Sequence, residues 1–206
     1  MSIVFASIAP HPPIILPSVG SPEDRAQVKK TIEALEKLGK KLKELKPDLI
    51  IISSPHPDWG FNVPLHFLAK DFNKEIKTYL TGLEPPKFYF EEGKKVYKLK
   101  IENCKLKIAL IASGDLSHCL RVDGPYGFHP DGPKFDKDLI EALKNKDIDN
   151  VLKLDDKYPE AGECGLRSFC FLLGILEEAG LNWQPEILSY EGPFGVGYLV
   201  ANFKLG

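Results

Sequence analysis

The sequence predicts a single α/β domain, residues 1–206, built on a mixed and largely parallel sheet that is flanked by helices. Three short apolar runs each end in a polar loop, and a helical pattern separates the first two. Continuous apolar runs are typical of parallel strands that are covered on both faces. A chain of 206 residues is long enough for one well-buried core and too short for two independent domains without a clear linker.

The first part of the chain has the order strand, helix, strand. Residues 3–8 are apolar and rich in β-branched side chains, which predicts a buried strand that ends before Pro10. Residues 21–45 carry apolar side chains at spacings of three and four, which predicts one long helix capped by Ser21. A second apolar run follows at residues 49–52. Because a right-handed crossover pairs such strands in parallel, both should end at the same edge of the sheet.

The middle and the end of the chain add an insertion, a third strand, helices and two closing strands. Residues 61–105 contain prolines and an alternating pattern at Tyr97, Leu99 and Ile101, which favours an antiparallel insertion at the edge of the sheet. Residues 106–112 predict the third buried strand. We expect helices near residues 135–143, 148–154 and 165–179, the last ending at Gly180, and closing strands at residues 186–190 and 196–203.

Composition and charge narrow the classes of partner. The formal net charge is −2, and the 27 basic residues are dispersed among 29 acidic ones, so no nucleic-acid or anionic-membrane surface is indicated. No stretch approaches the roughly 18 to 20 apolar residues that span a bilayer, and a cytoplasmic location is expected. The cysteines lack metal-ligand and disulfide spacing, which predicts reduced thiols at Cys104, Cys119, Cys164 and Cys170.

Histidines follow all three predicted strands of the parallel sheet. His11, His56 and His118 each lie in the loop after an apolar run. Ligands of open α/β sheets bind outside the carboxyl ends of the strands, so these side chains are expected to share one site. A single histidine after a strand more often makes a loop hydrogen bond than binds a metal. Three histidines at equivalent positions favour a shared ligand-binding site.

Two of these histidines and a later acidic residue are candidates for a metal site. A facial triad of two imidazoles and one carboxylate holds iron(II) and leaves positions free for substrate and dioxygen. His11 and His56 supply the imidazoles, and Glu163, at the start of a predicted helix, supplies the carboxylate; helix capping is its alternative role. His118 is the candidate acid or base, oriented by Asp115, although a turn hydrogen bond also explains this pair.

Two further residues are candidates for substrate contacts. His129 lies in a loop rich in glycine and proline that is able to fold over the site, and a structural loop histidine is the alternative. Arg167 presents a planar fork that suits a substrate carboxylate, and a salt bridge on the helix explains it equally well.

Four motifs resemble one known superfamily. Residues 11–13 (HPP), 54–56 (SPH) and 114–118 (GDLSH) are similar, in the same order, to the metal and catalytic motifs in the catalytic subunits of class III extradiol ring-cleavage dioxygenases. That superfamily includes the Memo-like proteins. Residues 189–198 (SYEGPFGVGY) resemble the last segment of a prokaryotic branch that is often associated with AMMECR1-like and radical-SAM proteins.

The resemblance implies the fold of those catalytic subunits, iron(II), dioxygen and a catechol-like small molecule as substrate. It leaves the third metal ligand open, because dioxygenases use glutamate there and Memo-like proteins use a cysteine before a glycine. Glu163 is our choice and Cys164, followed by Gly165, is the alternative. A thiolate would favour copper or zinc over iron(II) and make ring cleavage less expected.

Three functions follow from these patterns. The first is extradiol cleavage of a catechol-like or related aromatic compound by an iron(II) oxidoreductase. The second is a Memo-like metal-binding accessory protein that acts with a partner, such as an AMMECR1-like or radical-SAM protein. The third is zinc-dependent hydrolysis at the same site. The resemblance also implies a homodimer.

Overall fold

One six-stranded sheet organises the protein. The computed structural model describes residues 3–103 and 105–206, so Cys104 lies outside the described residues. The strand order is β3-β2-β4-β1-β6-β5; the first four are parallel, and β6 and β5 run antiparallel. This confirms the predicted mixed and largely parallel sheet. The strands are β1 (Ile3–Ala9), β2 (Leu49–Ser54), β3 (Glu75–Leu80), β4 (Ile108–Ser113), β5 (Trp183–Glu191) and β6 (Tyr198–Leu205).

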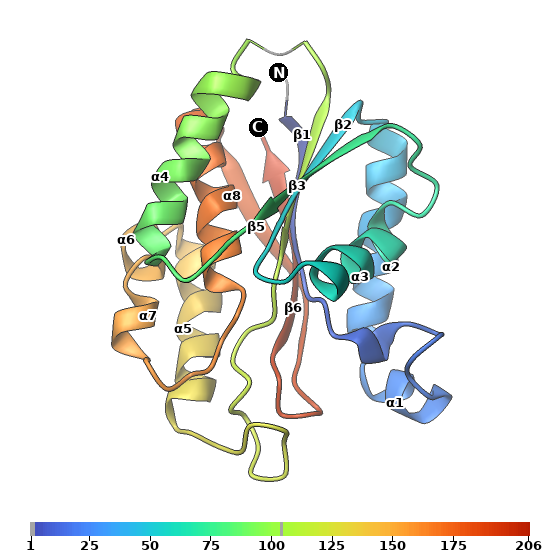
Figure 1. Ribbon diagram of the computed structural model, residues 1–206, viewed down its shortest axis with the longest axis vertical. Coiled ribbons are helices and arrows are strands. Elements are labelled where there is room, and N and C mark those ends of the chain that lie inside the picture. Colours follow the sequence, from blue (N-terminus) through green and yellow to red (C-terminus); the bar gives the residue numbers. More distant parts are fainter. Residues whose placement is uncertain (1–2, 104) are drawn as a thin grey trace.

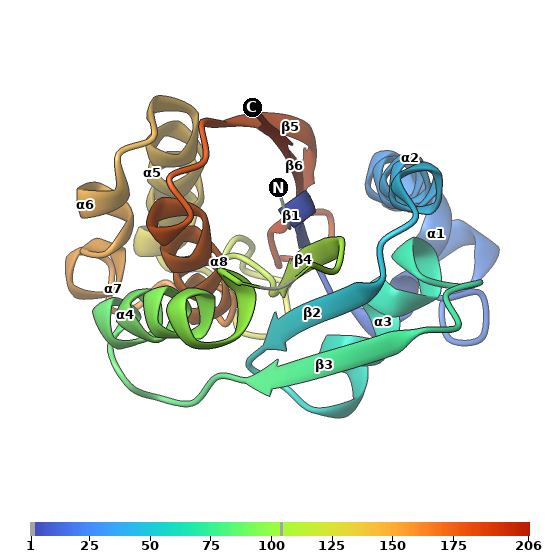
Figure 2. The ribbon, with the colours of Figure 1, turned by 90° about the horizontal axis from the view of Figure 1, so that it is seen from above.

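Helices cover both faces of the sheet (Figures 1 and 2). One face packs against α4, α5 and α8, and the other against α2 and α3, with a separate apolar core on each side. Every residue of β2 and β4 is buried, as expected for strands enclosed in this way. The helices are α1 (Pro22–Gln27), α2 (Lys29–Leu45), α3 (Asp58–Leu68), α4 (Pro86–Val96), α5 (Asp131–Asn145), α6 (Ile148–Val151), α7 (Leu154–Lys157) and α8 (Leu166–Glu178), with single turns at Pro13–Ile15 and Tyr97–Ile101.

The single helix predicted for residues 21–45 is two helices. Ser21 does cap the first turn, where its hydroxyl accepts from the Asp24 backbone in a capping box. The chain leaves the helical conformation at Val28, with φ −115° and ψ 28°. α1 buries none of its residues, whereas α2 buries six, so only the second helix packs its side chains into the core. The predicted helix was too long because the regular apolar spacing of α2 was taken to continue into the residues of α1.

The antiparallel insertion predicted for residues 61–105 is wrong. This segment forms α3, an edge strand β3 that pairs in parallel with β2, helix α4 and a π-helical turn at Tyr97–Ile101. The alternation that suggested a strand therefore lies on a helical turn, in which Ile101 is buried and Leu99 is 80% exposed. Two of its apolar residues point in different directions because of helical winding, not because of pleating.

The parallel strands place their carboxyl ends at one edge. β1 pairs with β4, and β4 with β2, so the loops that follow these three strands leave the sheet side by side. The carboxyl edge is therefore where the predicted site residues should be found.

Within residues 3–103 and 105–206, no helix has the length and apolar character needed to cross a bilayer.

Candidate metal centre

Three potential metal ligands converge at the carboxyl edge of the sheet. His11 follows β1, His56 follows β2, and Cys164 lies two residues before the start of α8. One ligand atom from each lies within 4.8 Å of the other two. The two imidazole rings meet edge to face, with centroids 5.2 Å apart and an interplanar angle of 77°. His11 is buried and His56 is exposed, so the group opens to solvent on the His56 side.

The hydrogen bonds of His11 select the tautomer that a metal ligand needs. The Ser113 hydroxyl donates to the backbone carbonyl of Gly60, so its oxygen is left to accept from Nδ1 of His11 at 3.0 Å. Nε2 then carries the free lone pair and faces Sγ of Cys164 at 3.6 Å. Burial, followed by the neighbouring His56, lowers the pKa of His11 to about 3. The ring is therefore neutral and oriented, as coordination requires.

Two glycines bring Cys164 to the histidines. Gly114, directly after β4, packs against the backbone of Gly165, and a Cβ atom on Gly114 would overlap Cα of Gly165. The backbone N–H groups of Cys164 and Gly165 both donate to the carbonyl oxygen of Asp115, at 3.4 and 3.0 Å. The backbone N–H of Asp115 in turn faces Sγ of Cys164 at 3.3 Å. This close approach fixes the loop before α8 against the loop after β4.

The carboxylate of Glu163 points away from this group. Its Oε2 accepts from the backbone N–H of Leu166 at 2.6 Å, and its Oε1 lies 3.1 Å from Nη1 of Arg167. Its side chain is only 6% exposed, and burial raises its pKa to about 7. Glu163 therefore caps the first turn of α8 and pairs with Arg167, while its neighbour Cys164 faces the histidines. The structure thus places the alternative ligand, and not our first choice, in the group.

Asp115 and His118 form a second group with the same thiol. One ligand atom from each of Asp115, His118 and Cys164 lies within 4.8 Å of the others. Asp115 Oδ1 also accepts from the backbone N–H of His11 at 2.9 Å. Burial raises the pKa of Asp115 to about 6, and burial likewise lowers the pKa of His118. Among the described residues, Nε2 of His118 is buried without a hydrogen-bond partner, an atom left free for a ligand.

The two candidate substrate residues are engaged elsewhere. His129 is 42% exposed, and its Nδ1 accepts from the backbone N–H of Asp131 at 3.3 Å. Arg167 donates to the carbonyl of Glu84, to Glu163 and to Asp155, so its three guanidinium nitrogens all have partners. Neither residue is in the two ligand groups. Their substrate-binding roles stay predictions.

A buried network behind His118 was missed by the sequence patterns. Asp136, from α5, accepts from the backbone N–H of Ser117 at 2.8 Å and from the hydroxyl of Tyr190 at 2.6 Å. The Ser117 hydroxyl donates to the carbonyl of Ala161 at 2.7 Å, three residues before Cys164. Asp136 thus ties α5 and β5 to the loop that carries His118. The polar residue on the buried face of α5 was the available signal.

This network predicts a pH-dependent stability. Burial raises the pKa of Asp136 to about 7, although both hydrogen bonds oppose this shift. The folded state then holds a proton that the unfolded state loses near pH 4, so the free energy of unfolding should fall between about pH 4 and pH 7. The contribution is on the order of 4 kcal/mol. The free energies of unfolding of wild type and Asp136→Asn, measured with denaturant across this range, should be similar at low pH. The variant should become more stable relative to wild type as the pH rises.

Asp136→Asn is a matched variant because an amide has the same shape and is able to bond both neighbours. Its oxygen accepts from Ser117, and its nitrogen donates to the hydroxyl oxygen of Tyr190. A constant difference between the two stability curves from pH 4 to pH 7 would show that Asp136 is ionised in the folded protein throughout this range.

Comparisons with known proteins agree with this architecture. Residues 5–57 and 53–201 match the model of the family described as the catalytic LigB subunit of aromatic ring-opening dioxygenase. Protein CA_C1420 of Clostridium acetobutylicum is 32% identical over 274 aligned positions, which cover 99% of this chain. The chain spans 58% of the length of that relative.

A solved structure shows the same fold. The crystal structure of the uncharacterised protein JW3007 from Escherichia coli K12 superposes with a TM-score of 0.65 and covers 96% of this chain and 98% of that chain. Its sequence identity is 17%, so this likeness concerns the fold alone. Because the family model covers nearly the whole chain, and because the histidine loops meet at the expected edge of the sheet, the chain belongs to the LigB family of aromatic ring-opening dioxygenase catalytic subunits.

Proposed function

We propose that this chain is a metal-dependent oxidoreductase whose metal is held by His11, His56 and Cys164, in the manner of the Memo-like branch. The observation that carries the proposal is the convergence of one ligand atom from each residue within 4.8 Å. Three protein ligands leave coordination positions for a small molecule, and exposed His56 leaves a path from solvent.

The residues fit a metal in two further respects. His11 is held neutral with Nε2 directed at the group, which requires no change of tautomer on binding. Nε2 of His118 is a buried nitrogen without a partner among the described residues, and such an atom is costly unless a ligand satisfies it. Both features support a site shaped for an ion and a bound molecule.

The donor set bears on the kind of ion. Two imidazoles and a thiolate suit copper and zinc, whereas a carboxylate would suit iron(II) better. Because the family is described by an oxidative reaction, we propose a redox-active ion, with copper first on the donor set and iron(II) second. When bound, the ion would supply Lewis acidity and electron transfer next to the small molecule. Burial and Asp115 raise the pKa of the Cys164 thiol, so metal binding should release its proton to solvent.

The chain's own residues supply the proton chemistry. His118 is partly buried, and its lowered pKa keeps the imidazole neutral and able to accept a proton from a bound hydroxyl group. Asp115 lies beside it and would stabilise the imidazolium that forms. The bond from Asp115 to the backbone of His11 holds this carboxyl in place during the transfer.

Extradiol cleavage of a catechol-like compound by iron(II) is the second candidate. The buried and unpartnered Nε2 of His118 favours it, because ring cleavage needs an acid or base that is free to bind a phenolic hydroxyl. Zinc-dependent hydrolysis is a third candidate for the same donors. An accessory role beside an AMMECR1-like or radical-SAM protein, and a homodimer, belong to the Memo-like proposal.

Metal analysis and oxygen uptake separate these functions. Anaerobic purification followed by elemental analysis should give stoichiometric copper or iron under the first proposal. Oxygen uptake with a panel of catechols should then be absent for a Memo-like protein and present for a ring-cleaving enzyme. Stoichiometric zinc without oxygen uptake would support hydrolysis and contradict the oxidoreductase.

His118→Ala tests the assigned proton transfer. The variant should keep the wild-type amount of metal, because the ligand set of His11, His56 and Cys164 is intact, and lose turnover by about 100-fold or more. The readouts are metal stoichiometry and the rate of substrate-dependent oxygen or electron consumption. Loss of metal in this variant would place His118 among the ligands instead.

A further inference from the structure

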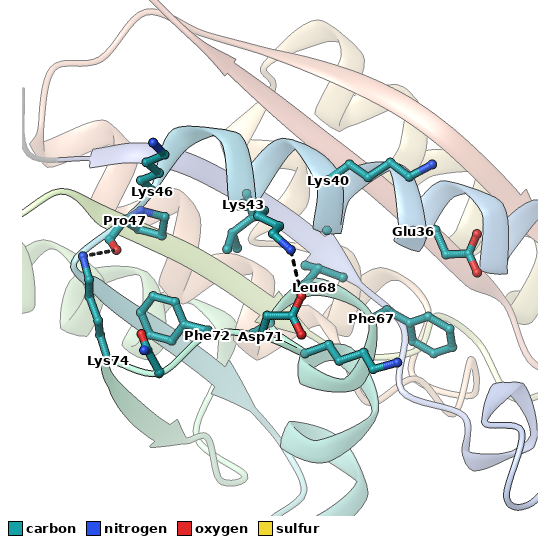
Figure 3. Close-up of a pocket in the computed structure, with 15 residues that line it drawn as sticks. Glu36, Lys40, Lys43, Lys46, Pro47, Phe67, Leu68, Asp71, Phe72 and Lys74 are labelled. Atoms are coloured by element: carbon teal, nitrogen blue, oxygen red, sulfur yellow. Dashed lines mark hydrogen bonds and ion pairs between the residues drawn. The ribbon is translucent and has the colours of Figure 1, made fainter.

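A cavity lies at the opposite edge of the sheet from the candidate metal centre. It has a volume of about 540 Å³ and lies between the second half of α2 and the segment that joins α3 to β3 (Figure 3). α2 leads into the start of β2, and residues 69–74 lead into the start of β3, so the cavity is at the amino-terminal edge of the strands. We call it the α2–α3 groove.

The inner surface of the groove is apolar. Leu42 from α2 and Leu68 from α3 are buried, and Phe67 and Phe72 are partly buried. Gly39 allows the two helices to come this close, because a Cβ atom there would overlap the carbonyl oxygen of Phe67. The groove is therefore built by helix packing and is lined by side chains that water solvates poorly.

The rim of the groove is basic. Five lysines line it against two acidic residues, and Figure 3 shows three of the lysines along α2. Two are paired: Nζ of Lys43 lies 2.8 Å from Asp71, and Nζ of Lys74 lies 2.7 Å from Asp48. The other three have no ion-pair partner within residues 3–103 and 105–206, namely Lys40, Lys46 and Lys70.

One of these lysines occupies an unusual backbone position. Lys46 ends α2 in the left-handed conformation, with φ 50° and ψ 60°, where glycine or asparagine is usual. A lysine there keeps a positive charge beside Pro47, at the end of the groove. The same position would be less strained with glycine. Lys46 thus adds a cationic side chain to the rim, in the same backbone conformation that Lys146 adopts at the end of α5.

We propose that the α2–α3 groove binds a small molecule with an apolar body and an anionic end group. The volume lies in the range of about 300 to 1,000 Å³ that small-molecule sites occupy. The apolar body would lie against Leu42, Leu68 and Phe72, and the anionic group would meet the unpaired lysines. This site is separate from the candidate metal centre and does not depend on the function proposed for it.

Decanoate is a direct probe of the full chain. Titration followed by amide chemical shifts should give saturable changes concentrated in residues 36–47 and 67–74. Decanol, which has the same chain without charge, should bind more weakly, and decyltrimethylammonium should not compete with decanoate. Equal binding of the anionic and cationic probes, no saturable binding of decanoate, or shifts centred on another region would overturn the proposal.

Matched variants separate the groove from general charge effects. Replacement of three rim lysines (Lys40→Gln, Lys46→Asn and Lys70→Gln) should weaken decanoate binding by about 10-fold, with asparagine chosen because it tolerates the left-handed backbone at position 46. Three exposed lysines elsewhere serve as the control, replaced as Lys30→Gln, Lys87→Gln and Lys134→Gln. An equal loss in both triple variants would contradict a specific site.

The ion pair between Lys43 and Asp71 gives an opposite test. Both side chains are more than 60% exposed, so their mutual attraction is weak, and a ligand anion would compete with Asp71 for Lys43. Asp71→Asn should therefore increase the affinity for decanoate and leave that for decanol unchanged. A parallel change for both probes would show that charge at the rim does not select the ligand.

Discussion

Cys164→Ala should remove tight metal binding, whereas Glu163→Gln should retain it. Cys164 faces the two histidines, while the carboxylate of Glu163 is occupied by Leu166 and Arg167. Loss of a direct ligand should exceed the roughly 10- to 100-fold that loss of an outer partner costs. Anaerobic titration with cobalt(II) measures the effect: wild type and Glu163→Gln should show thiolate-to-cobalt charge-transfer absorption, and Cys164→Ala should not.

Glu163→Gln is the control of closest shape: its single amide oxygen still accepts from the backbone N–H of Leu166, although its NH2 group no longer accepts from Arg167. It changes the charge of the adjacent side chain without changing the thiol. If Glu163→Gln abolished binding while Cys164→Ala kept stoichiometric metal, the carboxylate would be the ligand. The iron(II) ring-cleavage function would then become the better proposal.

Gly114→Ala should lower metal affinity by about 10- to 100-fold without replacing any ligand. The new methyl group would overlap the backbone of Gly165, so the loop that carries Cys164 must move away from His11 and His56. Backbone atoms on both sides of this contact leave no flexible side chain to yield. Cobalt(II) titration, at a temperature where circular dichroism shows the variant to be folded, measures the affinity.

Gly82→Ala controls for the loss of a glycine as such. A methyl group there would meet only the hydroxyl of Tyr89, at 3.2 Å, and none of the three ligands. This variant should bind metal as wild type does. Unchanged affinity in Gly114→Ala would show that the loop before α8 adjusts freely, and that the position of Cys164 does not depend on this contact.

The sequence predicted that His11 and His56 lie together at one edge of the sheet, because their positions follow from simple rules. Apolar runs before His11 and His56 identified buried strands, and parallel pairing placed the ends of those strands together. It could not decide between Glu163 and Cys164, because adjacent loop residues point in different directions. That direction is set by the ion pair of Glu163 with Arg167 and by the contact of Gly114 with Gly165. The ion pair is local and was the alternative role given to these residues, but Gly114 lies far earlier in the chain and no local pattern reveals its contact.

The remaining errors have a similar physical origin. Apolar spacing alone joined α1 to α2, although the conformation of Val28 separates them. The pair of Asp136 and Tyr190 spans 54 positions, so the polar residue on the buried face of α5 had no visible partner in the sequence. Long-range packing decides these features, and neighbouring residues carry little information about it.

The partly buried thiol of Cys164 has a consequence for the chemical reactivity of the protein. Thiolates, and not thiols, react with alkylating agents and peroxide, and the surroundings of Cys164 hold its pKa well above the ordinary range. While the site holds no metal, this sulfur should therefore react more slowly with alkylating agents than an ordinary cysteine does. The thiol of Cys164 should become a reactive thiolate only when a metal ion binds and displaces its proton.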